Sequence, residues 1–314
     1  MPAAILAGLI GAGIGKSLTP AMHEREGAAQ GLVYIYRLID LDRLGLPGSA
    51  LPDLLDAAER LGFDGLNITY PCKQTVIGHL HELSQDARDI GAVNTVVFRD
   101  GRRIGHNTDW LGFVEGFRRD LPGAPLNHVV LLGAGGAGSA VAHALLFMGA
   151  RRLTIVDTDR EKALALAAVL QTRFGPGCAS VGEAEEAMPH ADGLVNATPV
   201  GMAKHPGLPL DPSLLRPSQW VADVIYFPAE TELLRHARRI GCRAINGGGM
   251  VVFQAVEAFR LISGRQAVAS RMQAHFEALC STELGPQADS SAANRQSNGI
   301  SRQPPNPEGR QPCA

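Results

Sequence analysis

Hydrophobic residues recur along this chain in short runs, separated by longer amphipathic stretches. The short runs are rich in Val, Ile and Leu and predict β-strands, whereas most of the stretches between them have the spacing of helices. The predicted strands are Ile5–Ile10, Tyr34–Leu41, Gly65–Thr69, Val93–Phe98, Val129–Leu132, Leu153–Val156, Gly193–Ala197, Val221–Val224 and Arg243–Ile245. This alternation predicts an α/β fold with mostly parallel sheets.

The pattern also predicts a division into two units. A new α/β unit begins near Val129, and the helical run Asp109–Leu121 before it is the predicted connector. The helical run Val251–Ile262 follows the last strand, and the amphipathic stretch 268–279 after it suits either unit on its pattern alone. From about Gly285 onward Pro, Ser, Gln and Asn dominate, which predicts a disordered tail to which we assign no function.

Composition narrows the class of protein. The chain has 314 residues, of which 45% are hydrophobic and 19% charged, and its net charge is −2. These values fit a globular protein of two domains and give no basic excess for nucleic acid or an acidic membrane surface. No apolar run has the length of a membrane helix, and the apolar start lacks the basic residues of a signal peptide. The five cysteines are widely spaced, so we expect no metal site, no disulfide framework and a cytoplasmic location.

The most specific local signal is a Gly-rich turn between a strand and a helix. Gly133, Gly135, Gly136 and Gly138 form a G-x-G-G-x-G segment directly after an apolar strand, and the predicted helix Ser139–Met148 follows. Glycines in this context permit a tight turn and a close approach of the backbone to a pyrophosphate at the helix N-terminus. The segment therefore predicts a dinucleotide site, although a Gly-rich turn without a ligand has the same local pattern.

The next strand ends in an acidic residue that bears on the choice of dinucleotide. Asp157 follows Val156, where a carboxylate suits the ribose hydroxyls of NAD and repels the 2′-phosphate of NADP. Arg160 lies close by and has the charge to hold such a phosphate, and Asp157 also suits a helix cap. We predict NAD, with NADP as the weaker alternative. A second Gly-rich segment, Gly11–Gly15, is not expected to bind a dinucleotide, because Ser17-Leu-Thr-Pro follows it at once.

Seven segments together resemble the shikimate/quinate dehydrogenase family, in the family's order and spacing. They are Ser17-Leu-Thr19-Pro20, Asn67-Ile-Thr69-Tyr-Pro71-Cys-Lys73-Gln74, Gly91-Ala-Val-Asn94-Thr95, Asn107-Thr-Asp109, Gly133–Gly138, Asn196-Ala-Thr198-Pro199, and Gly247-Gly-Gly-Met250 with Gln254. The resemblance implies an N-terminal α/β substrate domain with a mostly parallel sheet and a Rossmann domain, with the C-terminal helices returning to the first domain. The implied boundaries are 1–110 with 249–281, then 111–248, with the tail at 282–314.

The resemblance also implies roles for individual residues. Lys73 and Asp109 would handle the proton of an alcohol as it is oxidised, although a Lys–Asp pair by itself is usually an ordinary ion pair. The implied substrate-binding residues are Ser17, Thr19, Thr69, Asn94, Tyr226 and Gln254, and the implied cofactor-binding residues are Gly133, Gly135, Gly136, Ala137, Gly138, Asp157, Asn196, Thr198, Pro199, Val224 and Gly247. On residue type alone Ser17 and Thr19 suit helix capping, Gln254 a helix surface and Tyr226 core packing.

We therefore expect an NAD-dependent dehydrogenase of quinate, shikimate or both, acting on a small hydroxylated ring acid. The first alternative is a biosynthetic NADP-dependent shikimate dehydrogenase. That subgroup resembles the chain less, because its first motif typically ends Ser-Pro where this chain has Thr19-Pro20, and it commonly has Asn-Arg where this chain has Asp157-Thr158. An amino-substituted quinate or shikimate is a further alternative substrate. A non-catalytic dinucleotide sensor is disfavoured by the presence of Lys73, Asp109 and Gln254. The sequence predicts neither the direction of the reaction nor the oligomeric state.

Overall fold

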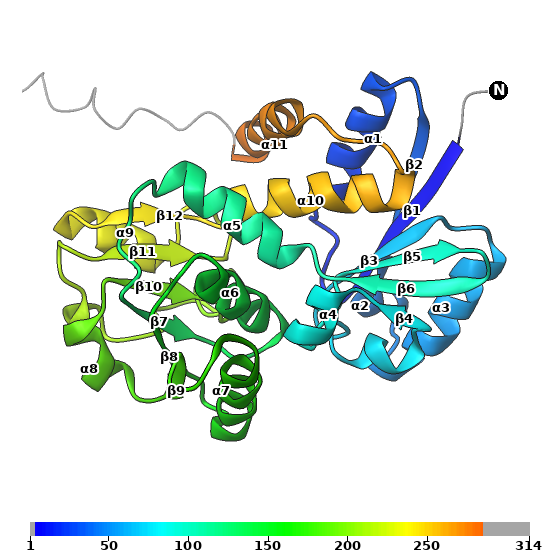
Figure 1. The fold of residues 1–314 in the computed structure, drawn as a ribbon. Helices are drawn as coiled ribbons and strands as arrows, with labels where there is room; N and C mark the ends of the chain where they lie inside the picture. The colour runs from blue at the N-terminus through cyan, green and yellow to red at the C-terminus, as the bar shows by residue number, and fades with distance from the viewer. Residues whose placement is uncertain (1–3, 285–314) are drawn as a thin grey trace, which may run out of the picture.

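Two six-stranded sheets organise residues 4–284, the part of the chain that this computed structural model describes (Figure 1). Each sheet forms the centre of one lobe. The first sheet has the strand order β2 (Val33–Asp40), β1 (Ala4–Gly11), β3 (Gly65–Ile68), β5 (Thr95–Arg99), β6 (Arg102–His106) and β4 (Glu82–Leu83). The second has the order β12 (Arg243–Ile245), β11 (Trp220–Asp223), β10 (Gly193–Asn196), β7 (His128–Leu132), β8 (Arg152–Val156) and β9 (Ala179–Val181).

The second sheet has the topology of a Rossmann fold. All of its strand pairs are parallel, and its first strand, β7, lies between β8 and β10. The chain therefore leaves β7 in one direction along the sheet for β8 and β9 and later returns to the other side for β10. In such sheets ligands bind beyond the carboxyl ends of the strands at the point where the order reverses. This confirms the predicted Rossmann-type architecture and places its binding edge beside β7 and β10.

The first sheet is mixed, but three of its five strand pairs are parallel, which agrees with the expectation of a mostly parallel sheet. β1 is parallel to β2 and to β3, and β4 is parallel to β6, but β5 is antiparallel to both β3 and β6. A hairpin joins β5 to β6 at Asp100 and Gly101, whose φ angles are 53° and 69°, and makes these two strands antiparallel. An Asp-Gly pair with two positive φ angles matches the twist of a hairpin. The pattern of hydrophobic residues missed β6 because that strand is largely charged and polar.

The helices cover the sheets and connect the lobes (Figure 1). In the first lobe they are α1 (Thr19–Ala29), α2 (Leu41–Leu44), α3 (Leu51–Arg60) and α4 (Gln85–Ile90); in the second, α6 (Gly136–Phe147), α7 (Arg160–Phe174), α8 (Ala184–Ala187) and α9 (Glu232–Ile240). Short 3₁₀ helices span Gly48–Ala50, Thr75–His79, Met188–His190 and Pro212–Leu214. α5 (Asp109–Asp120) leads from the first lobe to the second, and α10 (Gly248–Ser263) leads back, followed by α11 (Ala269–Leu284).

The last two helices pack on the first lobe. Val252 and Phe259 of α10 and Met272 of α11 belong to the same buried core as Ala7 of β1. The stretch 268–279, which the pattern left unassigned, therefore packs with the N-terminal sheet. α11 continues to Leu284, past the predicted start of the tail at residue 282, because the helix-breaking residues begin only at Gly285 and Pro286. The rest of the predicted tail lies outside the described residues.

α5 and α10 cross in close contact where the lobes meet. A Cβ atom on Gly112 of α5 would lie 2.5 Å from the backbone oxygen of Met250 and 2.8 Å from the backbone nitrogen of Gln254. One turn further on, a Cβ on Gly116 would lie 3.0 Å from the backbone of Gly249. Only glycines allow the two backbones to approach this closely. The contact sets the distance between Asp109 at the start of α5 and Gln254 on α10.

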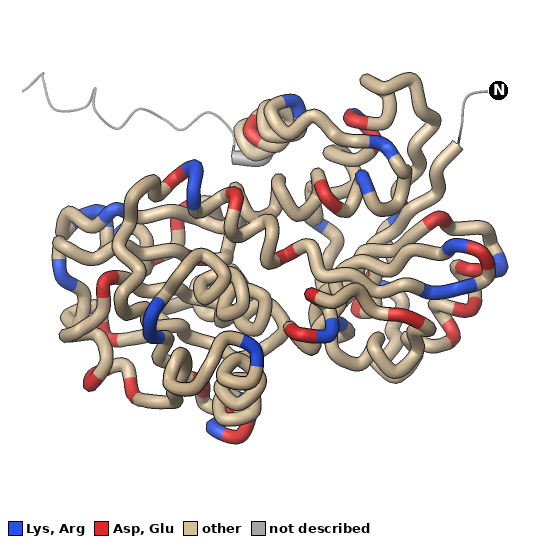
Figure 2. Tube along the Cα trace, viewed as in Figure 1, with Lys and Arg blue, Asp and Glu red and all other residues tan. Residues whose placement is uncertain are grey.

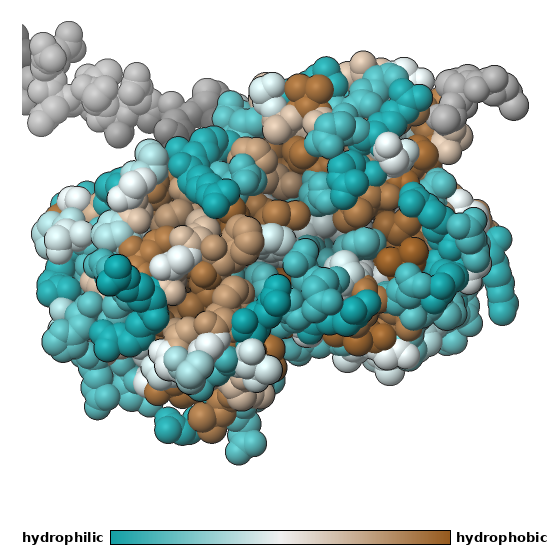
Figure 3. All heavy atoms as spheres, in the orientation of Figure 1, coloured by the Kyte–Doolittle hydropathy of each residue, from teal (hydrophilic) through white to brown (hydrophobic). Residues whose placement is uncertain are grey.

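The surface mixes charges of both signs. Figure 2 shows Lys and Arg interspersed with Asp and Glu over both lobes. In the view of Figure 3 hydrophobic residues gather over α5 and α6, where the Phe147 side chain is 53% exposed. Within residues 4–284, no helix combines the length and the hydrophobicity required to span a membrane.

Candidate active site

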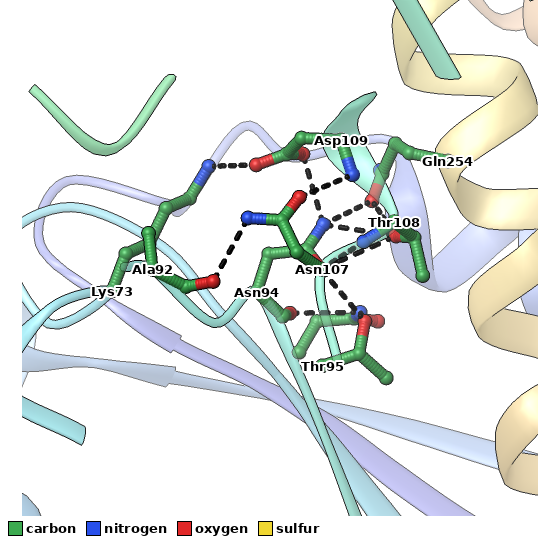
Figure 4. A network of polar contacts seen from close by, with 9 residues as sticks. Lys73, Ala92, Asn94, Thr95, Asn107, Thr108, Asp109 and Gln254 are labelled. Carbon is green, nitrogen blue, oxygen red and sulfur yellow. Dashed lines mark hydrogen bonds and ion pairs between the residues drawn. The ribbon is translucent and has the colours of Figure 1, made fainter. Parts of the chain in front are cut away.

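A hydrogen-bonded network joins four of the residues that the sequence marks as functional (Figure 4). Lys73 Nζ donates to Asp109 Oδ2 at 2.6 Å. Asn94 Nδ2 lies 2.9 Å from Asp109 Oδ1 and 3.3 Å from Gln254 Oε1. The carboxyl group of Asp109 is nearly buried, with 7% of the side chain exposed, whereas 17% of the Lys73 side chain is exposed. Lys73 is therefore the more exposed member of the ion pair, and Asp109 lies buried beneath it.

Local backbone structure positions this network. Lys73 follows β3 in a turn, and its backbone oxygen accepts from Val93 N at 2.8 Å. Asp109 is the first residue of α5, where its backbone nitrogen donates to Asn107 Oδ1 at 3.0 Å. Asn107 Nδ2 donates in turn to the backbone oxygen of Ala92 at 3.0 Å. The segments that carry Asn94 and Asp109 are thus tied together from both sides.

Sequence reasoning assigned no role to three residues that support the network. Asn107 orients Asp109, as described above, and Thr108 N donates to Asn94 Oδ1 at 2.7 Å. Asn67 is buried beneath them, where its Nδ2 donates to Thr95 Oγ1 at 2.9 Å and its Oδ1 accepts from Tyr36 Oη at 2.7 Å. All three lie in the segments 67–74 and 107–109 that resemble the dehydrogenase family. Their position in these motifs could have indicated a role in the site.

The other predicted substrate residues lie outside this network. Ser17 Oγ and Thr19 Oγ1 are 3.1 Å apart, directly before and at the start of α1. Thr69 follows β3, and its methyl carbon lies against Gly11 at the end of the neighbouring strand β1. Tyr226 packs near Phe276 of α11, with 6.3 Å between ring centroids. Ser17 and Thr69 follow β1 and β3, whose parallel pairing brings both to one edge of the first sheet.

In the predicted dinucleotide turn, each glycine of the fingerprint has a different structural reason to lack a side chain. Gly133 has a φ angle of +99°, which strongly favours glycine. A Cβ on Gly138 would lie 2.0 Å from the backbone oxygen of Gly133, so α6 packs directly on the turn. A Cβ on Gly135, in contrast, would meet no protein atom within 4 Å. The open side of Gly135, at the N-terminus of α6, fits the close approach of a pyrophosphate. Ala137 follows in the first turn of the helix.

Asp157 lies at the end of β8 and faces the same turn. Its Oδ2 accepts from Ala134 N at 2.6 Å and its Oδ1 accepts from Asp159 N at 2.8 Å. Each carboxylate oxygen can accept a further hydrogen bond. Helix α7 is capped by Asp159 and not by Asp157, so the capping alternative for Asp157 does not apply. Asp157 is therefore held against the Gly-rich turn and keeps capacity to accept further hydrogen bonds.

The remaining predicted cofactor residues meet at the carboxyl ends of β10, β11 and β12. Asn196 Oδ1 accepts from Thr198 Oγ1 at 2.6 Å, and the exposed Pro199 follows Thr198. A Cβ on Gly247 would lie 2.0 Å from the backbone oxygen of Val224, so the loops after β11 and β12 are in contact. All these residues lie at the binding edge that the strand order defines.

Asp223 is a buried acid behind these loops that sequence reasoning missed. Asn196 Nδ2 donates to its Oδ1 at 3.1 Å, and Thr231 Oγ1 donates to its Oδ2 at 2.7 Å. Burial raises the pKa of Asp223 to about 6, although its hydrogen bonds with Thr231, Ile225 and Asn196 oppose the shift. Asp223 thereby joins the loop after β10 to the start of α9.

A Rossmann sheet whose binding edge faces a partly buried Lys–Asp pair in a second α/β lobe defines a class of dinucleotide-dependent oxidoreductases. The family model described as the shikimate dehydrogenase substrate binding domain matches residues 9–96, and a model of the ThiF family matches residues 125–162. Together with the relatives described next, these matches show that the chain belongs to the shikimate/quinate dehydrogenase family.

Three comparisons show how similar the chain is to known members. It is 58% identical over 280 residues to a shikimate dehydrogenase (NADP(+)) of Streptomyces avermitilis, covering 88% of this chain and 96% of the relative. It is 49% identical over 279 residues to a quinate/shikimate dehydrogenase (NAD(+)) of Corynebacterium efficiens, covering 88% and 98%. A solved structure of quinate dehydrogenase from Corynebacterium glutamicum in complex with NAD has a TM-score of 0.81 and 49% identity, covering 88% of this chain and 99% of that one.

Proposed function

We propose that the chain transfers a hydride from the ring C3 hydroxyl of quinate, shikimate or both to NAD, forming 3-dehydroquinate or 3-dehydroshikimate. The observation that carries this proposal is the 2.6 Å contact between Lys73 Nζ and Asp109 Oδ2. The amide of Asn94 joins this pair to Gln254. In this proposal residues 1–110 with 249–281 bind the ring acid, and residues 111–248 bind the dinucleotide.

The proton of the alcohol is handled by the Lys73–Asp109 pair. Oxidation of an alcohol removes a hydride from carbon and a proton from oxygen, and bound NAD supplies the acceptor for the hydride. Lys73 Nζ is the more exposed member of the pair. As a neutral amine it takes the hydroxyl proton and becomes an ammonium group, which Asp109 orients and whose charge Asp109 balances. Because the two groups are hydrogen-bonded, the proton belongs to the pair as a unit.

The residues around the pair suit a hydroxylated ring acid. Asn94 and Gln254 offer amide groups to ring hydroxyls, and Asp109 can accept from a further one. Ser17 and Thr19 place hydroxyl donors at the N-terminus of α1, where an anionic carboxylate is favoured. Thr69 and Tyr226 complete the pocket in this assignment. A substrate with hydroxyls on one side and a carboxylate on the other can satisfy both groups of residues.

Asp157 favours NAD over NADP. Its carboxylate already accepts from the backbone of the Gly-rich turn, so it is held where the adenosine ribose would lie. A 2′-phosphate there would meet a negative charge and take the place of the hydroxyls that the carboxylate can bind. The similar relatives include proteins named for each cofactor, and Arg160, the first residue of α7, is exposed nearby. A shikimate dehydrogenase that prefers NADP is thus the second candidate.

A matrix of substrates and cofactors tests the proposal. The purified full chain is assayed with quinate, shikimate and their amino-substituted analogues, each with NAD and with NADP. Reduction of NAD with quinate or shikimate is the expected result. A preference for NADP with shikimate would establish the second candidate, and reduction only with an amino-substituted ring would move the substrate to that class. No cofactor reduction with any ring acid would overturn the proposal.

A further inference from the structure

Gly136 is a glycine that the dinucleotide fingerprint does not require. In a G-x-G-x-x-G segment the required glycines correspond to Gly133, Gly135 and Gly138. Positive φ accounts for Gly133, packing against the turn for Gly138, and open space for Gly135. Gly136 begins α6 with none of these features, so another contact must account for the missing side chain.

That contact is with the proposed catalytic lysine in the other lobe. A Cβ on Gly136 would lie 3.2 Å from Lys73 Cβ and 3.3 Å from Lys73 Cδ, with Ala92 Cβ next at 3.8 Å. Contacts between carbon atoms are optimal at about 3.5–4.0 Å. The Lys73 stem therefore lies in the space that a side chain at position 136 would occupy. The first residue of the cofactor-binding helix and the lysine are direct neighbours across the two lobes.

The Lys73 side chain has little freedom to move away from this neighbour. Its backbone oxygen accepts from Val93 N at 2.8 Å, and its ammonium group donates to Asp109 Oδ2 at 2.6 Å. Gly136 lies against the carbons between these two ends. The stem is thus held at the backbone, along its length and at its head, and any displacement of the stem must alter the contact with Asp109.

We propose that Gly136 is a positioning residue for Lys73: the absence of a side chain at the first position of α6 lets the lysine stem lie against the cofactor loop and aligns Nζ with Asp109. The inference rests on the proposed function, in which Lys73 handles the proton, and it adds a residue of the Rossmann lobe to the alignment of that group. It also means that the alignment depends on how closely the cofactor loop approaches the first lobe.

The substitution Gly136→Ala tests this with a distinctive kinetic result. The added methyl group should displace the Lys73 stem by a few tenths of an ångström, and kcat should fall by about 3–30-fold, since a misplacement of 1 Å can cost about a hundredfold. Ala stabilises a helix more than Gly does, so the melting temperature should not fall. The backbone nitrogen that faces a pyrophosphate is unchanged, so the Kd for NAD should stay within about twofold of the parent.

The neighbouring glycine supplies the matched control. Gly135→Ala adds a methyl group to the same loop but on the open side, where no protein atom lies within 4 Å. It should raise the Kd for NAD about tenfold or more by blocking the pyrophosphate. Adjacent substitutions would then act on different quantities, kcat for position 136 and cofactor affinity for position 135. A loss of NAD affinity in Gly136→Ala equal to its loss of kcat would overturn the proposal.

A double-mutant cycle shows whether the effect passes through the lysine. In a Lys73→Ala background the stem beyond Cβ is absent, so Gly136→Ala should lower the residual kcat by less than twofold. A full 3–30-fold loss in that background would mean that Gly136 acts on something other than Lys73 and would overturn the proposal.

A second measurement does not depend on turnover. The chain contains only four lysines, Lys16, Lys73, Lys162 and Lys204, so selective ¹³C,¹⁵N-lysine labelling gives a readable set of side-chain NMR signals. The Lys73 signal, assigned by its loss in Lys73→Ala, should shift in Gly136→Ala and stay in place in Gly135→Ala. An unshifted signal would refute the contact. Because these spectra need no substrate, they test the contact even if the ring-acid assays overturn the proposed function.

Discussion

Among single residues, Lys73 is the one on which the proposed proton transfer depends most. Replacing Lys73 by Ala removes the group proposed to receive the hydroxyl proton and leaves Asp109 without its ion-pair partner. We predict a fall in kcat of about 10²–10⁴, the usual cost of losing a positioned acid or base, with little change in the Kd for NAD, because the nucleotide binds the other lobe. Steady-state kinetics and NAD titration measure the two effects.

The matched control is Lys162→Ala. Lys162 lies on α7, is 61% exposed and pairs with Asp159 at 2.9 Å, and a surface pair of this kind contributes little. Its kcat should stay close to that of the parent. A Lys73→Ala enzyme as active as this control, with chemistry limiting turnover in the parent, would remove Lys73 from the mechanism.

A second prediction at this scale concerns Asp157 and Thr158. Asp157→Asn combined with Thr158→Arg removes the negative charge and supplies a guanidinium group for a 2′-phosphate. Each tenfold change in discrimination needs only about 1.4 kcal/mol, so we expect the ratio of kcat/KM for NAD to that for NADP to fall by at least about tenfold, chiefly through KM. Initial rates with both cofactors decide it. An unchanged ratio would mean that Asp157 does not face the ribose.

The residues that carry the proposed chemistry were predictable from the sequence, because they lie in motifs of recognisable order. The residues that support them were less predictable, because their contacts form only in the folded chain. Lys73, Asn94, Asp109 and Gln254 are far apart in the chain, and the structure joins them in one network. Asn67, Asn107 and Thr108 were missed as supporting residues because their role depends on which backbone atoms lie opposite them. Asp223 was not predicted, because the sequence does not distinguish a buried acid at the end of a strand from an exposed one.

At the scale of helices and strands, the crossing of α5 and α10 controls the site. Gly112→Ala would force the methyl group toward the backbone oxygen of Met250 and the Gln254 Cβ, at 2.5 and 2.9 Å. Overpacking of this kind costs about 1–3 kcal/mol of unfolding free energy, and displacement of Gln254 should raise KM for the ring acid. Urea denaturation and substrate kinetics test both effects.

Gly78→Ala serves as the control, because a Cβ there would meet no atom within 4 Å. It should change the unfolding free energy by no more than about 0.5 kcal/mol. If Gly112→Ala were as stable and bound the ring acid as tightly as Gly78→Ala, the two helices could not be in the contact described.

The packing of α1 against β2 and α10 gives a prediction about pH. His23 of α1 is fully buried among Tyr34, Tyr36 and Phe259, and burial lowers its pKa to about 3. The unfolded chain binds this proton near pH 6.5. Because the unfolded state then holds more protons, the free energy of unfolding falls as the pH drops from about 6.5 toward 3, by up to about 1.4 kcal/mol per pH unit from this group.

A His23→Gln variant lacks this titration. Its free energy of unfolding should therefore depend less steeply on pH between 6 and 4 than that of the parent, whatever the cost of the substitution at pH 7. Urea denaturation at several pH values gives the two slopes. Equal slopes would mean that His23 takes up its proton in the folded state.

Most elements were predictable from the hydrophobic pattern, and the exceptions have physical reasons. All nine predicted strands overlap observed ones, because buried parallel strands are nearly continuous apolar runs. The pattern missed β4, β6 and β9, which are short or polar and lie at or near sheet edges. The Asp100-Gly101 turn was a usable hairpin signal that would have revealed β6 and the mixed sheet. The packing of α11 required tertiary structure, since its apolar face suits either lobe.

At the scale of the whole molecule, two lobes bring together groups that neither sheet supplies alone. Exposed contacts between the lobes link Lys204 to Asp42 at 3.4 Å and place Lys16 Nζ 5.6 Å from the ring centroid of Phe227. The pair proposed to handle the proton lies in the first lobe, and the edge proposed to bind the cofactor lies in the second. In the proposed function, a hydride crosses from a ring carbon held by the first lobe to a nicotinamide held by the second.

Transfer of deuterium from the ring carbon to the cofactor tests this hydride transfer. Quinate and shikimate carrying deuterium at C3 are incubated with NAD and the full chain, and the reduced cofactor is analysed by mass spectrometry and NMR. We expect the deuterium to appear on the nicotinamide ring, at a rate that falls by about 10²–10⁴ in Lys73→Ala. Reduced NAD without deuterium, or no reduced NAD from either ring acid, would contradict it.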